Sequence, residues 1–240
     1  MTLAVAAVGI SARADTANGL LPVISPSDYS SYISLAKQGD SEAERIVGDC
    51  FLTGVGTDKN LREAWRWYGR AAKNGDNEAR YRIACMYRAG VGVHKSDKEA
   101  AYWYGRAAKN GHALALLNLA DCYYEGRGII GDKRIAAENY WRAADRGVAE
   151  AAYKLGIMLR DGIGLPQNKS MALKYLNQAA DANYGNASQL ASNLVREGVK
   201  PAQTIRKSSA KSSKNSIASK HKAAKKTHKS HKKSHRSRRR

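Results

Sequence analysis

The nonapeptide WYGRAAKNG occurs twice in this 240-residue chain, at Trp67–Gly75 and, letter for letter, at Trp103–Gly111. The copies begin 36 residues apart, and the same interval relates many other residues. Four such blocks, the first beginning at Gly39, align without a gap. Their recurrent residues are Ala43, Ala79, Ala115 and Ala151; Gly54, Gly90, Gly126 and Gly162; and Gly56, Gly92, Gly128 and Gly164. This regularity predicts a repeat protein in which each unit packs on the next.

Each block is expected to form two helices. Apolar or small residues fall at block positions 5, 9, 12 and 13, which share one face of a helix with 3.6 residues per turn. The first glycine suits the left-handed residue that ends a helix. The second helix is expected to begin after a residue whose side chain can cap free N–H groups, namely Asn60, Ser96, Asp132 or Asn168.

The predicted fold class is therefore all-α, a right-handed α-α superhelix (solenoid) of four 36-residue helix-turn-helix repeats with a half-repeat at each end. The solenoid is expected to cover residues 28–198, with a cap for its first helix at Ser27 or Asp28. The predicted repeats span residues 39–74, 75–110, 111–146 and 147–182, and the final half-repeat spans 183–198.

The pattern A-x₃-[LI]-[GA]-x₂-Y-x₂-G-x-G, followed by A-x₂-[WY]-Y-x₂-A-A-x₂-G, resembles the Sel1-like repeat, a relative of the tetratricopeptide repeat. The resemblance covers about residues 28–198. It departs from the pattern late in the array, where Trp141 and Asn177 stand in the column of Gly105 and Leu176 replaces a tyrosine. The resemblance implies a helical scaffold for protein complexes, often of the bacterial envelope, and it implies no reaction.

The residues that recur at the same position in each block are expected to serve packing. Tyr68, Tyr104 and Tyr140 recur at one helical phase, as expected of rings that hold neighbouring helices together. Gly69 and Gly105 are expected to permit close helix approach. The Gly-x-Gly pairs lack the strand and further residues of phosphate-binding loops, and Cys50, Cys85 and Cys122 are interpreted as small apolar helix residues.

Catalytic and metal-binding constellations are absent from the sequence pattern. No nucleophile, base and orienting group stand at an interpretable spacing. His94 and His112 have no ligand partners at metal-site spacing and are expected at the surface. We therefore expect a non-enzymatic protein with no cofactor, no bound metal and no small-molecule substrate. The sequence offers no residues that would support the reaction of a cell-wall hydrolase.

A partner surface is expected in the columns that vary. By analogy with the tetratricopeptide pattern, block positions 4, 7, 11 and 14 of the first helices line the concave groove and bind a protein or peptide, with ordinary solvated residues as the alternative. Tyrosine and arginine favour such a role because they are frequent at interface hot spots. The predicted partner-binding residues are Arg45, Asp49, Tyr81, Arg88, Asp121, Tyr124, Tyr153 and Arg160.

The amino-terminal region resembles a secretory signal. An apolar run at Leu3–Ile10 precedes small residues at Ala12 and Ala14, which predicts a signal peptide at 1–14 and a linker at 15–27. The protein would then be periplasmic or secreted. The alternative is a cytoplasmic protein with a frayed, alanine-rich amino terminus. No apolar run reaches the length of a transmembrane helix.

The formal net charge of +20 comes mainly from the carboxyl-terminal tail. Residues 199–240 hold 16 Lys or Arg and no Asp or Glu, against 25 basic and 21 acidic residues in 1–198. The tail is expected to be disordered and to bind a polyanion through counterion release. That polyanion is an envelope polymer or anionic lipid, or, in a cytosolic nucleic-acid-associated adaptor, DNA or RNA. The predicted contacts are Lys225, Lys226, Lys229, Lys232, Lys233, Arg236, Arg238, Arg239 and Arg240.

Overall fold

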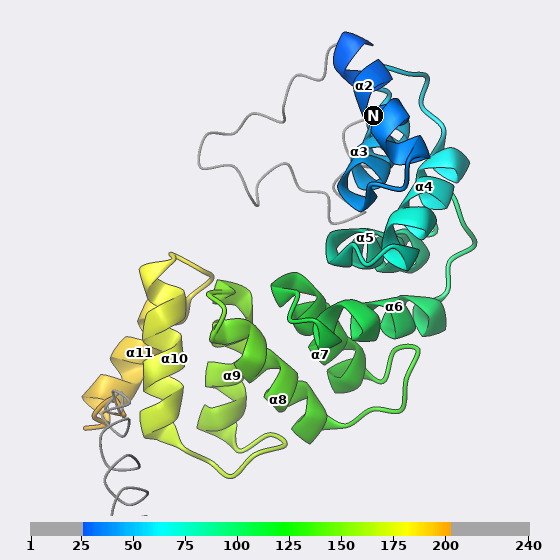
Figure 1. Ribbon diagram of the computed structural model, residues 1–240. Helices are drawn as coiled ribbons and strands as arrows, with labels where there is room; N and C mark the ends of the chain where they lie inside the picture. Colours follow the sequence, from blue (N-terminus) through cyan, green and yellow to red (C-terminus); the bar gives the residue numbers. More distant parts are fainter. Residues whose placement is uncertain (1–25, 203–240) are drawn as a thin grey trace, which may run out of the picture. The chain divides into compact units, whose positions relative to one another are not determined.

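A computed structural model describes residues 26–202, and these residues form ten helices and no strand (Figure 1). The helices are α2 (Pro26–Lys37), α3 (Ser41–Thr53), α4 (Leu61–Lys73), α5 (Asn77–Ala89), α6 (Asp97–Lys109), α7 (Ala113–Glu125), α8 (Lys133–Ala144), α9 (Ala149–Asp161), α10 (Lys169–Asp181) and α11 (Ala187–Arg196). The predicted signal peptide at 1–14, most of the linker and the tail contacts from Lys225 onward lie outside the described residues.

Consecutive helices pack against each other along the whole described chain. Helices α3, α5, α7 and α9 follow one another in what we call the first-helix row, and α4, α6, α8 and α10 form the second-helix row (Figure 1). Each repeat contributes one helix to each row, and α2 and α11 are the half-repeats. The predicted all-α solenoid of four 36-residue repeats is confirmed. Within residues 26–202, no helix combines the length and apolarity that crossing a bilayer requires.

The predicted second-helix caps are confirmed. The side chains of Asn60, Ser96, Asp132 and Asn168 each accept a hydrogen bond from a backbone N–H in the first turn. The first helices α3, α5, α7 and α9 each end at a glycine in the left-handed conformation, with φ between 70° and 82°. One cap prediction was wrong, because α2 begins at Pro26 rather than after Ser27 or Asp28. The fixed φ of proline suits the first position of a helix, where a missing N–H costs nothing.

The core is built from small and ring-bearing residues at repeated positions. Tyr68, Tyr104 and Tyr140 are almost fully buried, as are Leu176 at the same position of the fourth repeat and the three free cysteines. Burying a large side chain stabilises a fold by on the order of 1.5–3 kcal/mol. The repeated rings are thus explained by packing, as the sequence predicted.

Two glycine interpretations from the sequence need correction. A Cβ atom on Gly69 or Gly105 would meet no other atom within 4 Å, so neither residue permits a close helix approach. The close approach occurs instead at Gly48 on α3, where a Cβ atom would lie 2.7 Å from the ring of Tyr68. Gly69 and Gly105 point away from the core, which the column pattern alone did not reveal.

The second glycine of each Gly-x-Gly turn also serves packing between repeats. A Cβ atom on Gly128 would lie 2.0 Å from the carbonyl oxygen of Asp97, the first residue of α6 in the preceding repeat. Gly92 approaches Leu61, at the start of α4, in the same way. The turn after each first helix is therefore pressed onto the start of the preceding second helix.

Side chains of one repeat also satisfy backbone carbonyls of another. Arg142 Nη2 donates to the carbonyl of Ala108 at 3.3 Å, and Gln178 Nε2 donates to that of Ala144 at 2.6 Å. Arg70 reaches Ala36 in the same way. These carbonyls lie in the last turn of a helix, where intrahelical partners are missing. Each such bond therefore links a second helix to the preceding second helix or, for Arg70, to the half-repeat helix α2.

Candidate protein-binding surface

The predicted partner-binding residues all lie on the first-helix row, distributed over α3, α5, α7 and α9. Because the repeats have the same length, these residues recur at equivalent positions of successive first helices. The residues differ sharply in what they contact, however. Four of the eight belong to clusters of bonded side chains that join neighbouring repeats, and the other four are half-buried or exposed.

Arg45 and Asp49 belong to an ionic network that joins the first two repeats. Asp49 accepts a 2.6 Å hydrogen bond from the hydroxyl of Tyr68 and lies 3.1 Å from Arg82 Nη1 on the next first helix. Arg45 reaches Asp49 at 3.4 Å and Asp76 at 3.3 Å. Burial raises the pKa of Asp49, and the charges of Arg82 and Arg45, with the Tyr68 hydroxyl, oppose that rise. The two residues thus connect repeats and are only partly open to a partner.

The same arrangement recurs two repeats later around Asp121. Its carboxylate accepts a 2.5 Å hydrogen bond from the hydroxyl of Tyr140 and a 2.7 Å one from Lys154 Nζ. Lys154 also pairs with Glu150 at 2.7 Å. An acid on one first helix is therefore bound by a tyrosine of its own repeat and a base of the next.

The second repeat uses neutral groups at the equivalent positions. Cys85 stands where Asp49 and Asp121 do, with its sulfur 3.5 Å from the hydroxyl of Tyr104. Asn118 replaces the base and lies 3.5 Å from the hydroxyl of Tyr81. Burial raises the pKa of Cys85, so its thiol stays neutral. Tyr81, only 6% exposed, packs inside this cluster rather than on a surface.

A charged pair that the sequence did not suggest lies near the start of the array. Glu44 is fully buried, and its carboxylate accepts hydrogen bonds from Arg70 Nε at 3.1 Å and Asn74 Nδ2 at 2.8 Å. A buried carboxylate is tolerable only when it is paired in this way. The other blocks carry Arg80, Leu116 and Ala152 at this position, so no column pattern indicated the pair.

His112 is the one histidine with a defined structural role among the described residues, and its expected surface position was wrong. It caps α7, because Nδ1 accepts a 3.1 Å hydrogen bond from the N–H of Ala115. Nε2 must then carry the proton, and it lies 2.7 Å from Glu78 Oε2. Burial opposes ionisation of Glu78, but the bonds from His112 and Arg82 outweigh it and lower its pKa. Both ring nitrogens are occupied, so this pair offers no free general base.

The remaining predicted residues form an accessible set. Arg88, Tyr124 and Arg160 occupy the same position near the carboxyl ends of α5, α7 and α9, and we call them the Arg-Tyr-Arg stripe. Tyr124 is 37% exposed, and the two arginines are half-buried. Arg88 is oriented by Asn118 at 3.0 Å, and Arg160 by a bidentate pair with Asp161 at 2.7 Å. Tyr153, on the same row, bonds Asn186 at 2.6 Å.

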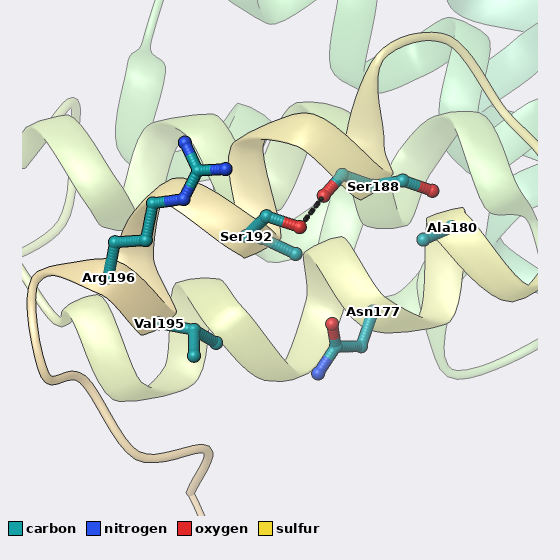
Figure 2. Close-up of a pocket in the computed structure, with 7 residues that line it drawn as sticks. Asn177, Ala180, Ser188, Ser192, Val195 and Arg196 are labelled. Atoms are coloured by element: carbon teal, nitrogen blue, oxygen red, sulfur yellow. Dashed lines mark hydrogen bonds between the residues drawn. The ribbon is translucent and has the colours of Figure 1, made fainter.

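Figure 2 shows a pocket between α10 and α11 at the end of the array. Its only charged lining residue is Arg196, and a hydroxyl of Ser192 is held by the carbonyl of Ser188 at 2.8 Å. Asn177, Ala180, Ala191 and Val195 complete the lining with Ser188 and Ser192. The residues supply no acid–base pair. Across residues 26–202, no group of three or more His, Cys, Asp or Glu is placed to hold a metal ion.

Comparisons with known proteins agree with this architecture. A solved structure of a protective antigen present in uropathogenic Escherichia coli strains, which displays an SLR fold, is 27% identical, with a TM-score of 0.70 over 78% of this chain and 40% of that one. A Sel1 repeat protein from Oxalobacter formigenes is 31% identical, with a TM-score of 0.67 over 70% of this chain and 49% of that one. The chain thus spans less than half the length of either protein. No curated protein matches it significantly.

The repeat itself is matched four times in succession. The family described as Sel1 repeat covers residues 41–76, 77–112, 113–148 and 149–184, each segment joining one first helix to the second helix that follows. Repeats of this kind generally mediate protein–protein interactions and are generally non-catalytic. The chain belongs to the Sel1 repeat family.

Proposed function

We propose that this protein is a non-enzymatic adaptor of the bacterial envelope whose first-helix row binds a protein partner. The observation that carries the proposal is the Arg-Tyr-Arg stripe, in which Arg88, Tyr124 and Arg160 present accessible side chains at one position of three successive repeats. Tyrosine and arginine are the residues most often found at interface hot spots. The stripe fits an extended segment with an apolar or aromatic group between two carboxylates.

The scaffold is suited to this role because the stripe stands on helices that are tied to each other. Asn118 holds Arg88 across a repeat boundary, and Asp161 holds the guanidinium of Arg160 in one orientation. Fixing a side chain before binding lowers the entropy that association must overcome. A partner would therefore meet a surface that is largely formed in advance.

The test is capture followed by a measured affinity. Proteins retained by the full chain from an envelope extract would be purified and titrated against wild type and the triple variant Arg88→Ala, Tyr124→Ala, Arg160→Ala. We expect the triple variant to bind at least tenfold more weakly, because each hot-spot truncation typically costs about 1–2 kcal/mol or more. A matched control is Glu42→Ala, whose side chain is largely exposed on the same row.

Equal affinity of the triple variant and wild type, with unchanged helicity, would rule out the stripe as the partner site. Loss of affinity in Glu42→Ala alone would move the site to the amino-terminal ends of the first helices.

The envelope location rests on the signal-like segment at 1–14. Amino-terminal sequencing of the mature protein, combined with cell fractionation, tests it directly. We expect a chain beginning at Asp15 in the periplasmic or secreted fraction. An intact Met1 in the cytoplasm would contradict the location and favour the nucleic-acid-associated adaptor instead.

The tail is proposed to hold the adaptor on an anionic surface, since residues 199–240 carry 16 cations and no carboxylate side chain. Binding that comes from counterion release falls steeply as salt rises. Chains covering residues 15–240 and 15–198 would be compared for binding to polyanions in a salt series. The longer chain is expected to bind more tightly at low salt, and equal binding would remove the tail from the account.

A further inference from the structure

The second-helix row carries an exposed concentration of positive charge on α4 and α6. Positions 2, 6, 9, 10 and 13 of these 13-residue helices share one helical face. We call the seven cations on it the basic face. They are Arg62, Arg66, Arg70 and Lys73 on α4, and Lys98, Arg106 and Lys109 on α6, and all are exposed. The three other positions hold Gly69, Tyr102 and Gly105, so the face contains no carboxylate.

Most of this charge is not neutralised inside the chain. Arg66 pairs with Glu63, and Arg70 pairs with the buried Glu44. In the part of the chain that the structure describes, the other five cations have no ion-pair partner. This contrasts with the first-helix row, where Arg45, Arg82 and Lys154 are each bound to carboxylates.

Several cations on the face are held in position. The guanidinium of Arg70 lies 4.4 Å from the ring centroid of Trp67 while its Nη2 bonds the carbonyl of Ala36. Arg106 Nη1 donates to the hydroxyl of Tyr102 at 2.8 Å. Between them, Gly69 and Gly105 have open space where a side chain would stand. The charged groups are therefore the most prominent features of the face.

The excess of positive charge is confined to the first two repeats. At the same positions, the cations Arg134 and Arg142 of α8 are balanced by Glu138 and Asp145, and Lys174 of α10 is balanced by Asp181. Trp141 replaces the glycine on α8 and is about half-exposed. The basic face is thus a bounded patch, and its lysine and arginine residues include those of the copied nonapeptide.

The extent and composition of the patch decide what it fits. Arg62 and Lys73 are 11 residues apart, which is roughly 16 Å along a helix, too far for both to meet one small anion. A protein interface is depleted of charge at its centre, whereas this face is charged throughout. We propose that the basic face docks on a membrane surface of anionic phospholipids, whose phosphates extend widely enough to contact cations on both helices.

Tyr102 supports a membrane surface over a soluble polyanion. Its ring is 52% exposed beside the cations, packed edge-on against Trp103 at 5.5 Å. Exposed tyrosines among basic residues are typical of the headgroup region of a bilayer. The choice of lipid over nucleic acid also rests on the envelope location proposed above.

The first experiment measures which lysines of the full chain contact the vesicle, so that binding by the tail and binding by the face are distinguished. Lysines would be acetylated with and without vesicles of phosphatidylglycerol, and with neutral phosphatidylcholine vesicles as a control. We expect Lys73, Lys98 and Lys109 to be protected at least threefold by anionic vesicles only. Lys169, an exposed lysine at the start of α10 and outside the face, should keep its reactivity.

The second experiment compares two full-length variants with the same loss of charge. The face variant is Arg62→Gln, Lys73→Gln, Lys98→Gln, Lys109→Gln. The control variant is Lys59→Gln, Lys95→Gln, Lys133→Gln, Arg196→Gln, all exposed residues outside the face. We expect vesicle binding in about 0.15 M salt to fall at least tenfold more in the face variant than in the control.

Equal weakening of both variants, or protection of Lys169 to the same degree as Lys73, would overturn the basic face as the docking site. Protection of the face by duplex DNA or polyglutamate, without protection by anionic vesicles, would overturn the membrane as its partner. These outcomes are distinct from failure of the envelope adaptor, because fractionation and the stripe variant are measured without vesicles. Specific vesicle binding by a cytoplasmic protein would sustain the face and refute only the location.

Discussion

The two helix rows use charge in opposite ways. On the first-helix row, Asp49 and Asp121 are bound by a tyrosine of their own repeat and a base of the next. On the second-helix row, Lys73, Lys98 and Lys109 remain free in the described part of the chain. The comparison shows that positions that differ between repeats are not always the ones exposed to a partner. Several varied positions are engaged between repeats, whereas the copied nonapeptide contributes exposed cations.

The largest expected effect is the loss of Asp49. In a mostly buried site, Asp49→Ala removes the hydrogen-bond acceptor of the Tyr68 hydroxyl and one of the two carboxylates that pair with Arg82. Removing one member of such a pair costs up to about 3–5 kcal/mol, and the 26% exposure of Asp49 lowers our expectation to about 2–3 kcal/mol. Denaturant unfolding measures the loss. Lys73→Gln is the control on the other row and should change the free energy of unfolding by less than about 0.5 kcal/mol. Equal losses of unfolding free energy in the two variants would show that charges on the two rows contribute alike to stability.

A somewhat smaller effect tests whether the charged cluster of one repeat can be exchanged for the neutral cluster of another. Asp49→Cys with Arg82→Asn would place the neutral cluster of the second repeat into the first, where Tyr68 is already present. The single change Asp49→Cys is expected to cost about 2 kcal/mol, because it removes one of the two carboxylates that pair with the mostly buried Arg82. The double variant should recover about 1 kcal/mol of that loss, since contacting residues couple by about 0.5–3 kcal/mol. Strictly additive losses would show that positions 49 and 82 do not couple, and would contradict the exchange of one cluster for the other.

Two glycines give opposite expected results of about 1 kcal/mol. Gly48→Ala forces a methyl group against the ring of Tyr68 and should destabilise the fold by about 1 kcal/mol. Gly69→Ala fills open space within α4 and should stabilise it by about 0.5–1 kcal/mol, because alanine favours a helix interior. Thermal unfolding of the two variants checks both signs. A destabilising Gly69→Ala would restore the close approach that the sequence suggested.

The smallest effect concerns acid. The folded pKa of Glu78 is lowered, so its contribution to stability is present above its ordinary pKa of 4.5 and is lost as pH falls through the lower, folded value. Glu78→Gln should therefore lose less stability than wild type between pH 5 and pH 3. Because this side chain is 38% exposed, solvent screening keeps the expected difference below about 1 kcal/mol. Parallel pH profiles would show that the His112–Glu78 contact contributes nothing.

Helix boundaries, caps and left-handed glycines followed from the sequence because they depend on neighbours within one repeat. Asn60 caps α4 by local chemistry that needs no knowledge of the next repeat. The contacts between repeats did not follow, because they depend on how far one helix is displaced from the next. The pair of Glu44 and Arg70 is an example.

A signal for the first-helix network was nevertheless present. Position 11 of one block and position 8 of the next form matched pairs: Asp49 with Arg82, Cys85 with Asn118, Asp121 with Lys154, and Ile157 with Leu190. Acid meets base, neutral meets neutral and apolar meets apolar. Comparing columns across the block boundary, rather than within each block, would have identified Asp49 and Asp121 as residues that join repeats.

The sequence also did not predict which residues of the second helices face solvent. The periodicity placed Gly69 and Arg70 on α4, but only the packing of α4 shows that both lie on its solvent side. Arg88, Tyr124, Tyr153 and Arg160 remain predicted partner contacts. Their accessibility fits that role.

Protein binding by the first-helix row and lipid binding by the second-helix row can be separated by one titration. A purified partner would be titrated against the stripe variant Arg88→Ala, Tyr124→Ala, Arg160→Ala and the face variant Arg62→Gln, Lys73→Gln, Lys98→Gln, Lys109→Gln. We expect at least a tenfold rise in Kd for the stripe variant and less than a twofold change for the face variant. The reverse order would contradict this division of binding between the rows.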